Sequence, residues 1–317
     1  MMFKSGINLH SGISDFIQEK ESVSILCAYI KVSSLQSLLT DSSIRQIVVR
    51  WLISDLVQGS SDLELFDFCQ QNNIALYRNT RIHLKAFWDN ADSVMFGSSN
   101  ITKQGIGEIG NYNYELNGIC HDISFEDKLF LQNIIAESEL VDQNLYEKIK
   151  KIVEETPKPT MDYTVLDTSK TELDYFLLSQ LPMSETPAQL FQIYSDPLEF
   201  SSEDQKYALC DLSLYRIPLG LNEQDFFELL ADEFNQHPFV LKLKEHIKST
   251  PYQSLHYGGV VSWLRNNTTT VPTPRSWELK RNQIVNILYE WICYFDSKFS
   301  WNRPNYTQVI SYNHLST

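Results

Sequence analysis

The sequence lacks any run of about 18 uncharged apolar residues, the length that a membrane-spanning helix needs. It has only five cysteines, which are widely spaced and form no CxxC pair: Cys27, Cys69, Cys120, Cys210 and Cys293. This spacing predicts reduced thiols and neither a disulfide framework nor a zinc site. The first residues lack a basic start followed by an apolar core, so we expect no secretory signal, no membrane partner and a cytoplasmic protein.

Basic residues are also scarce, with 26 Lys and Arg against 40 Asp and Glu and a net charge of -14 over 317 residues. Taken over the whole chain, that charge argues against a nucleic-acid partner, because phosphate binders usually carry a basic face. Hydrophobic residues make up 43% of the chain, which excludes wholesale disorder. The length predicts two domains.

The negative charge is concentrated in the middle of the chain. Residues 1–161 have 14 basic and 21 acidic residues, residues 162–235 have 3 and 15, and residues 236–317 have 9 and 4. The change of character coincides with Thr156-Pro-Lys-Pro-Thr160, which cannot continue a helix. We therefore expect one domain over 1–155 and a mainly α-helical C-terminal domain over 162–317.

The first domain alternates strand-like and helix-like segments, which predicts an α/β fold with a mixed sheet. The predicted strands are apolar runs rich in β-branched and aromatic residues, at 22–30, 47–53, 74–77, 82–88, 93–96 and 112–119. The predicted helices include one that begins after a capping residue, Ser124.

The stretch from Ile82 to Thr102 contains the candidate catalytic residues. Side chains alternate faces along a strand, so His83 and Lys85 are expected to point the same way. The following strand ends in Gly97-Ser-Ser-Asn100, which supplies small polar donors where the hairpin returns. His, Lys, Ser and Asn together predict a phosphate site in which His can attack phosphorus or transfer a proton. No acidic cluster accompanies them, so this chemistry requires no metal ion or other cofactor.

With this spacing, the chain resembles the phospholipase D superfamily, whose signature is HxK, four residues, Asp, six residues, then GSxxN or GSxN. Here His83-x-Lys85 is followed after four residues by Asn90 and after six more by Gly97-Ser-Ser-Asn100, so 18 positions match without a gap. The resemblance covers roughly residues 1–150 and implies a phospholipase-D-like mixed β-sheet flanked by helices. The chain is similar to the single-motif Nuc-type endonucleases and BfiI/NgoFVII-type restriction endonucleases.

The resemblance also implies roles for the motif residues. In the family the histidine forms a phosphohistidine, which makes His83 the nucleophile. Lys85, Ser98 or Ser99, and Asn100 would hold the phosphate oxygens. By itself, a histidine such as His83 is more often a structural residue, and it is the matching register that favours the catalytic role.

A downstream carboxylate completes the implied site. The segment Asn113-Tyr-Glu-Leu-Asn117 looks like the one in which such enzymes place a Glu that orients the catalytic His. Glu115 would then hydrogen-bond His83 and fix its tautomer. Glu115 is equally well an ordinary strand-edge carboxylate, and the sequence leaves both interpretations open.

One position departs from the signature, because Asn90 stands where the family has Asp. Neighbouring Asp89 would need a one-residue shift, which reverses the side of a strand. Some nucleic-acid enzymes of the superfamily also lack this Asp. We assign Asn90 and Ser99 to substrate binding, and place Arg78 and Arg81 at flanking phosphates. Residues 78–103 hold 4 basic and 2 acidic residues, a local charge of +2.

The family site uses two HxK motifs. The other HxK here, His246-Ile-Lys248, has no GS pair at the required distance and is interpreted as a charged helix end. A complete site would then need two subunits whose His83 motifs meet across a two-fold axis, as in the single-motif members. We therefore predict a homodimer through the first domain.

The C-terminal domain has two features of undecided meaning. The acidic segment 162–235 is either a solvated face or a docking or nucleic-acid-mimicking surface. Cations and aromatics mix in 236–317, which suits a nucleic-acid surface, although these aromatics are equally core residues at helical spacing. The residues are Arg265, Arg275, Trp277, Lys280, Arg281, Lys298, Trp301, Arg303 and Tyr306.

These features favour a metal-independent phosphodiesterase that cuts DNA through a phosphohistidine in a dimeric site. The resemblance suggests a bacterial DNA-modification, restriction or phage-defence system, whose other proteins are further candidate partners. The alternative is a non-catalytic phospholipase-D-like scaffold that binds DNA or a partner helicase or ATPase. A lipid phosphodiesterase ranks below both, because no membrane anchor or basic amphipathic helix is evident.

Overall fold

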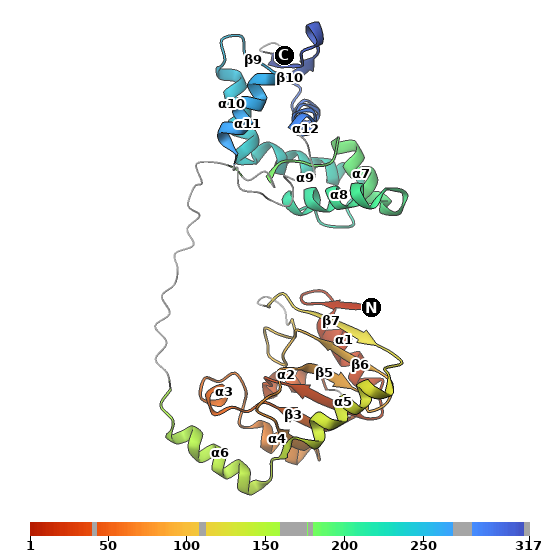
Figure 1. Ribbon diagram of the computed structural model, residues 1–317, viewed down its shortest axis with the longest axis vertical. Helices are drawn as coiled ribbons and strands as arrows, with labels where there is room; N and C mark the ends of the chain where they lie inside the picture. Colours follow the sequence, from red (N-terminus) through yellow and green to blue (C-terminus); the bar gives the residue numbers. More distant parts are fainter. Residues whose placement is uncertain (40–42, 108–111, 159–175, 177–179, 269–280, 314–317) are drawn as a thin grey trace. The chain divides into compact units, whose positions relative to one another are not determined.

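The computed structural model describes residues 1–39, 43–107, 112–158, 176, 180–268 and 281–313. The chain divides into two compact units, unit 1 (Met1–Val165) and unit 2 (Leu166–Thr317). Figure 1 shows a sheet with helices in unit 1, coloured red to yellow-green, and a mainly helical unit 2, coloured green to blue. The predicted fold class, a mixed sheet flanked by helices followed by a mainly helical part, is confirmed.

Unit 1 is built on an eight-stranded sheet in the order β1-β7-β6-β5-β2-β3-β4-β8. Strands β2, β3 and β4 are parallel, and the other neighbouring pairs are antiparallel. The strands are β1 Met2–Lys4, β2 Val23–Cys27, β3 Ile44–Val49, β4 Ala75–Arg78, β5 Lys85–Trp88, β6 Val94–Gly97, β7 Leu116–Cys120 and β8 Glu139–Leu140.

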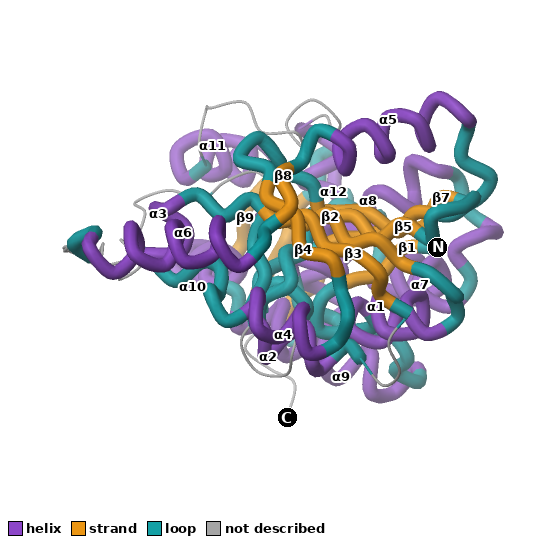
Figure 2. Tube along the Cα trace, turned by 90° about the horizontal axis from the view of Figure 1, so that it is seen from below, coloured by secondary structure: helices purple, strands orange, loops and turns teal. Residues whose placement is uncertain are grey.

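Helices cover both faces of this sheet, which is why the central strand β2 is buried along its whole length. The helices are α1 Leu9–Gln18, α2 Val32–Ser37, α3 Ile53–Val57, α4 Leu65–Gln71, α5 Phe125–Ala136 and α6 Gln143–Glu155. Figure 2 shows α5 on one side of the sheet and α1, α2 and α4 on the other. As predicted, Ser124 caps α5, in a reciprocal box with Asp127.

Unit 2 combines helices with a small three-stranded antiparallel sheet in the order β10-β11-β9, which the sequence did not predict. Its core is rich in aromatic rings, among them the buried Tyr289 and Trp291. The elements are α7 Pro187–Ser195, η2 Pro197–Glu199, α8 Ser202–Leu214, α9 Glu223–Gln236, α10 Pro238–Ser249, β9 Ser254–His256, α11 Tyr257–Asn267, α12 Arg281–Phe295, β10 Phe299–Asn302, η4 Pro304–Tyr306 and β11 Val309–Tyr312.

Two aromatic residues expected to form a nucleic-acid surface lie in different environments, with Trp301 partly buried against the core and Tyr306 on the surface. Trp301 packs on Tyr289 with ring centroids 6.0 Å apart, whereas Tyr306 is 93% exposed. Arg275, Trp277 and Lys280 lie outside the described residues. Among the helices that the structure describes, none combines the length and apolar character needed to cross a membrane.

Candidate phosphate site

Four strand ends meet at one edge of the unit 1 sheet. Strand β2 ends at Cys27, which pairs with Lys85, the first residue of β5. Strand β6 ends at Gly97, which pairs with Asn117 near the start of β7. The loop after β6 is held beside the end of β2, because Ile101 forms a parallel bridge with Ile30. The topology therefore brings the Lys85, 98–100 and Glu115 positions to the same edge.

Lys85 is the most buried cation at this edge, with only 9% of its surface exposed. Its ammonium donates a hydrogen bond to the backbone carbonyl of His83 over 2.8 Å. Burial is the main cause that lowers the pKa of Lys85, and the nearby Arg50 guanidinium acts in the same direction. The carboxylate of Glu115 opposes the shift. A bound anion would offset the cost of burying this ammonium, so Lys85 is suited to bind one.

The Ser-Ser pair after β6 is divided between two environments. Ser98 is exposed, and its hydroxyl donates to the carboxylate of Glu115 and accepts from the Leu116 N–H over 3.1 Å. Ser99 is only 1% exposed and donates to the side-chain oxygen of Asn117 over 3.0 Å. Ser98 is therefore the hydroxyl that a substrate can reach, whereas Ser99 ties the loop to β7.

Asn100 and Cys27 lie next to each other beside Lys85. The Cys27 thiol is 3.9 Å from the side-chain oxygen of Asn100 and donates to it. Burial raises the pKa of this thiol to about 11, so it is protonated at neutral pH and is a poor nucleophile. Cys27 therefore holds the side chain of Asn100 and is not a candidate nucleophile.

His83 is exposed and lies before β5, which begins only at Lys85. The expected strand over 82–88 is thus shorter at its amino end. His83 borders a groove of about 580 Å³ whose other wall is helix α5, with Phe130 and Ile134. Within the described part of the chain, the imidazole forms no hydrogen bond.

The expected hydrogen bond between Glu115 and His83 is absent among the contacts of the described residues. The Glu115 carboxylate accepts from Ser98 and, over 3.4 Å, from the amide of Asn113. The strand order explains the difference, because β6 lies between β7 and β5. Glu115 directly precedes β7 and Ser98 directly follows β6, so these two side chains meet across the antiparallel pair.

Asn90 lies at the opposite end of β5 from Lys85, in the turn that leads to β6. Its backbone is in the left-handed region with φ of 58°, which Asn tolerates better than most residues. Its amide donates to Ser22 over 2.8 Å, and its side-chain oxygen accepts from Ser24. The structure therefore separates Asn90 from the other motif residues, contrary to its assignment to substrate binding.

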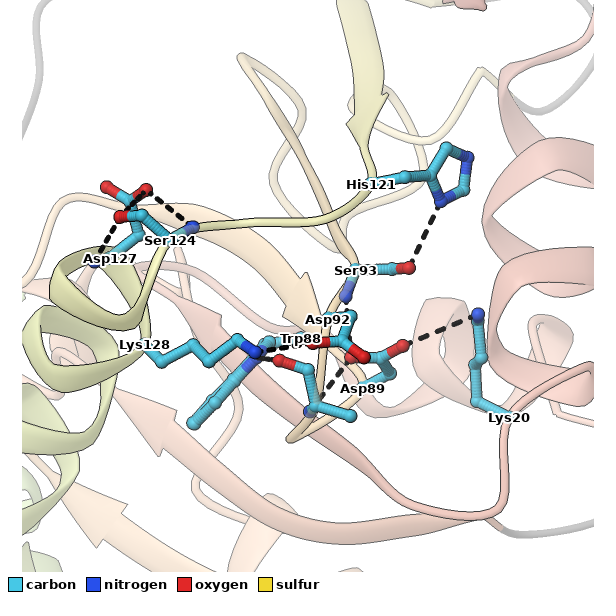
Figure 3. Close-up of polar contacts among 10 residues, drawn as sticks. Lys20, Trp88, Asp89, Asp92, Ser93, His121, Ser124, Asp127 and Lys128 are labelled. Carbon is cyan, nitrogen blue, oxygen red and sulfur yellow. Dashed lines mark hydrogen bonds and ion pairs between the residues drawn. The ribbon is translucent and has the colours of Figure 1, made fainter.

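Asp89 occupies the same turn and has a structural role. Its carboxylate accepts from the Ala91 and Ser93 N–H groups over 3.0 and 2.9 Å and pairs with Lys20 at 3.4 Å (Figure 3). Figure 3 also shows Lys128 of α5 reaching Asp92 in this turn. Asp89 is therefore held in this turn and does not lie with Lys85 and Asn100 at the other end of β5.

This placement predicts that Asn90→Asp leaves the DNA cleavage expected from the sequence within about two-fold and stability within about 0.5 kcal/mol. Asp tolerates the left-handed conformation and still accepts from Ser24, and the Ser22 hydroxyl can turn to donate to the carboxylate where it now accepts from the Asn90 amide. Asn90→Ala is expected to lower the free energy of unfolding by about 1–2 kcal/mol, since it loses both contacts and strains the backbone. Urea unfolding and a cleavage assay check both changes. A gain in activity of more than about ten-fold in Asn90→Asp, roughly 1.4 kcal/mol, would return this position to the site.

Both arginines assigned to flanking phosphates have protein partners. Arg78 donates to the Trp51 carbonyl over 3.0 Å and lies 3.7 Å from Glu139. Arg81 pairs with Glu137, and both side chains are exposed. Arg81 can exchange a solvated carboxylate for a phosphate at little cost, whereas Arg78 is fixed to the backbone.

Sequence reasoning missed Arg50, which directly follows β3. Its guanidinium donates to both carboxylate oxygens of Asp55, over 2.8 and 2.7 Å, and to the Tyr29 hydroxyl. It also lies over the Tyr29 ring, 4.7 Å from the centroid. In the sequence Arg50 lies inside the expected strand over 47–53. A charged residue within an apolar run, with an Asp five positions later, is the sequence signal that could have identified this ion pair.

The second HxK lies in unit 2, in the last turn of α10, as predicted for a charged helix end. The His246 ring stacks on Trp263, and Lys248 lies over the Tyr312 ring at 4.8 Å. In the parts of the chain that the structure describes, no group of three or more His, Cys, Asp or Glu residues is arranged to hold a metal ion.

Comparison with known proteins gave no matching family model and no matching curated protein. Among solved structures, the chain is similar to Nuc from Salmonella typhimurium, a phospholipase D family member, with 15% identity, a TM-score of 0.37, and coverage of 45% of this chain and 97% of that one. It is also similar to NucT from Helicobacter pylori, with 18% identity, a TM-score of 0.34, and coverage of 44% and 98%. Phosphatidylserine synthase from Haemophilus influenzae Rd KW20 gives 14% identity, a TM-score of 0.34, and coverage of 49% and 43%.

Proposed function

We propose that unit 1 is a phospholipase-D-like phosphodiesterase that cuts DNA without a metal ion. The observation that carries the proposal is the gathering of Lys85, Ser98, Asn100 and Glu115 at one sheet edge, with His83 two residues before Lys85. In this scheme His83 attacks phosphorus and forms a P–N bond while the P–O bond to the leaving nucleotide breaks. Water then attacks the phosphohistidine and releases His83.

The neighbouring groups supply charge and donors for that reaction. The Lys85 ammonium neutralises phosphate charge as it develops in the transition state. The amide of Asn100 donates to a phosphate oxygen. The single O–H of Ser98 is donated to Glu115 in the structure, so Ser98 donates to phosphate only once Glu115 has released it. For Glu115 to orient His83 directly, its carboxylate must exchange Ser98 for the imidazole when substrate binds.

The proposed site needs a second chain. One His83 motif provides a nucleophile, and the leaving oxygen needs a proton from another acid, which a second His83 supplies across a two-fold axis. We expect light scattering to give a mass of about twice that of one chain at micromolar concentration. A monomer at that concentration would contradict the composite site.

Chelation is the direct test of the proposed chemistry. We expect the protein to cut plasmid or single-stranded DNA in EDTA at a rate within about two-fold of that in magnesium, because no step uses a metal ion. Loss of all cleavage on chelation, with recovery on adding magnesium, would contradict this mechanism. The DNA-modification, restriction or phage-defence setting belongs to the same proposal, with other proteins of such a system as partners.

A second candidate function is a non-catalytic scaffold that binds DNA or a partner helicase or ATPase. The observation that favours it is that the carboxylate expected to orient His83 is engaged by Ser98 instead. DNA binding in a mobility shift without cleavage of either substrate, with or without magnesium, would support this alternative over the enzyme.

A further inference from the structure

Unit 2 contains a cavity of about 440 Å³ whose lining residues all belong to this unit. It is lined by residues from α7, α8 and α12 and from the segment before α7. Its apolar part is made by Met183, Ile193 and Ile287, which are 1%, 3% and 5% exposed. This surface can accept methylene groups and contributes no charge.

The polar part of the cavity is acidic. Glu185, Asp204 and Glu290 contribute three carboxylates, and no Lys or Arg is among the lining residues. In the described parts of the chain, none of the three forms an ion pair with a Lys or Arg. The amino ends of α7 and α8 offset part of this charge, by about half a positive charge each, which leaves a net charge of about -2. The cavity therefore disfavours anions.

A buried hydroxyl supplies a separate indication of a ligand. The backbone N–H of Ser184 donates to the buried Asp211 over 2.7 Å, and its carbonyl accepts from the buried Trp291 over 2.9 Å. Because both backbone groups point into the core, the side chain is the part of Ser184 that faces the cavity. Ser184 is 2% exposed, and its hydroxyl has no hydrogen-bond partner among the described residues. A buried hydroxyl usually has a partner, so Ser184 is poised to accept from a ligand N–H.

We propose that this cavity binds an alkylammonium or guanidinium group. The methylene stem of such a ligand would lie on Met183 and Ile287, as the stems of Lys and Arg do on apolar surfaces. Its cationic end would meet the carboxylates of Glu185 and Glu290 and donate to Ser184. The group belongs either to a free aliphatic amine or to a Lys or Arg side chain of a basic protein partner.

Calorimetric titration of the full-length protein tests the proposal with probes matched in shape. n-Pentylamine and n-pentanol share a stem and differ in charge, and the peptides acetyl-Gly-Lys-Gly-amide and acetyl-Gly-norleucine-Gly-amide differ in the same way. We expect each cationic probe to bind at least about ten-fold more tightly than its neutral match. Tighter binding of pentylamine would identify a free amine as the source, and tighter binding of the lysine peptide would identify a protein side chain.

Three variants locate the binding site. Glu290→Gln is expected to weaken binding of the cationic probes by about five-fold or more, and Ser184→Ala by about three-fold. Glu245→Gln removes an exposed carboxylate of α10 outside the cavity and is expected to change binding by less than about two-fold. Thermal melting confirms that each variant is folded. Equal binding of pentylamine and pentanol, or an equal loss in Glu245→Gln, would overturn the proposal.

Discussion

His83→Ala is expected to lower the DNA cleavage rate by on the order of 10⁴-fold or more, because it removes the atom that would bond to phosphorus. His83 is exposed and its side chain forms no hydrogen bond within the described residues, so the change should leave the free energy of unfolding within about 0.5 kcal/mol. DNA affinity in a mobility shift should also be retained, since the remaining donors at the edge are unchanged. Single-turnover cleavage in EDTA, with urea unfolding alongside, measures these quantities.

His246→Ala provides the matched control, because His246 belongs to the other HxK of the chain. It lies on α10 in unit 2 and stacks on Trp263. Its replacement should leave the cleavage rate unchanged within about two-fold and cost about 1 kcal/mol of stability at most. If both histidine variants cut DNA as fast as the wild type, the phosphohistidine mechanism at His83 fails.

The sequence predicted those parts of the fold that depend on interactions between residues close together in the chain. The continuous apolar run at 22–30 predicted a buried strand, because a strand covered on both faces needs no polar alternation, and β2 is buried along its whole length. Ser124 predicted the start of α5, since an exposed helix end must satisfy its first N–H groups. Both signals lie within a few residues of the structure that they determine.

The misses arise from contacts between segments distant in sequence. Which side chains meet at this sheet edge depends on the strand order β7-β6-β5. This order places Ser98 beside Glu115, and it separates His83 from Glu115 by strand β6. Asn90 fits the motif by spacing, but its φ of 58° and its contacts with Ser22 and Ser24 fix it in a turn. Motif spacing thus singled out the strand ends that carry Lys85, Ser98 and Asn100, while the strand order decides which of the predicted side chains lie together there.

The cluster around Arg50 was missed for a related reason. Asp55 is close in sequence, but Tyr29 and Lys85 come from β-strand ends that only the sheet brings near Arg50. The same applies in unit 2, where the cavity draws on α7, α8 and α12, which are spread over about 100 residues of sequence. Cross-strand and interhelical neighbours of this kind follow from topology, which a single sequence does not determine.

Lys85→Met is expected to separate function from stability at the proposed site. Methionine matches the length and apolar stem of Lys85 but removes a buried ammonium, so the free energy of unfolding at neutral pH should rise by about 1 kcal/mol. The cleavage rate should fall by about 10²–10³-fold, because phosphate charge is no longer neutralised. Higher stability together with slower cleavage is expected when a residue serves the reaction at a cost to folding. Replacing a structural lysine would lower stability instead.

The pH dependence of stability gives an independent check of the same residue. Burial lowers the pKa of Lys85 below its ordinary value of 10.5, so between the folded and unfolded pKa values the unfolded chain binds more protons. Wild-type stability should therefore gain relative to Lys85→Met as pH rises through that window, and the advantage of the variant should shrink. Below the window both states are protonated, and the difference should be constant.

Lys128→Met is the control for this experiment, because it removes an ammonium of α5 that pairs with Asp92 at the far end of the hairpin. It is expected to change stability by less than about 1 kcal/mol and to leave the cleavage rate within about two-fold. If Lys85→Met were less stable than the wild type and still cut DNA normally, Lys85 would be a structural residue. The sheet edge would then lack the cation on which the proposed phosphate chemistry depends.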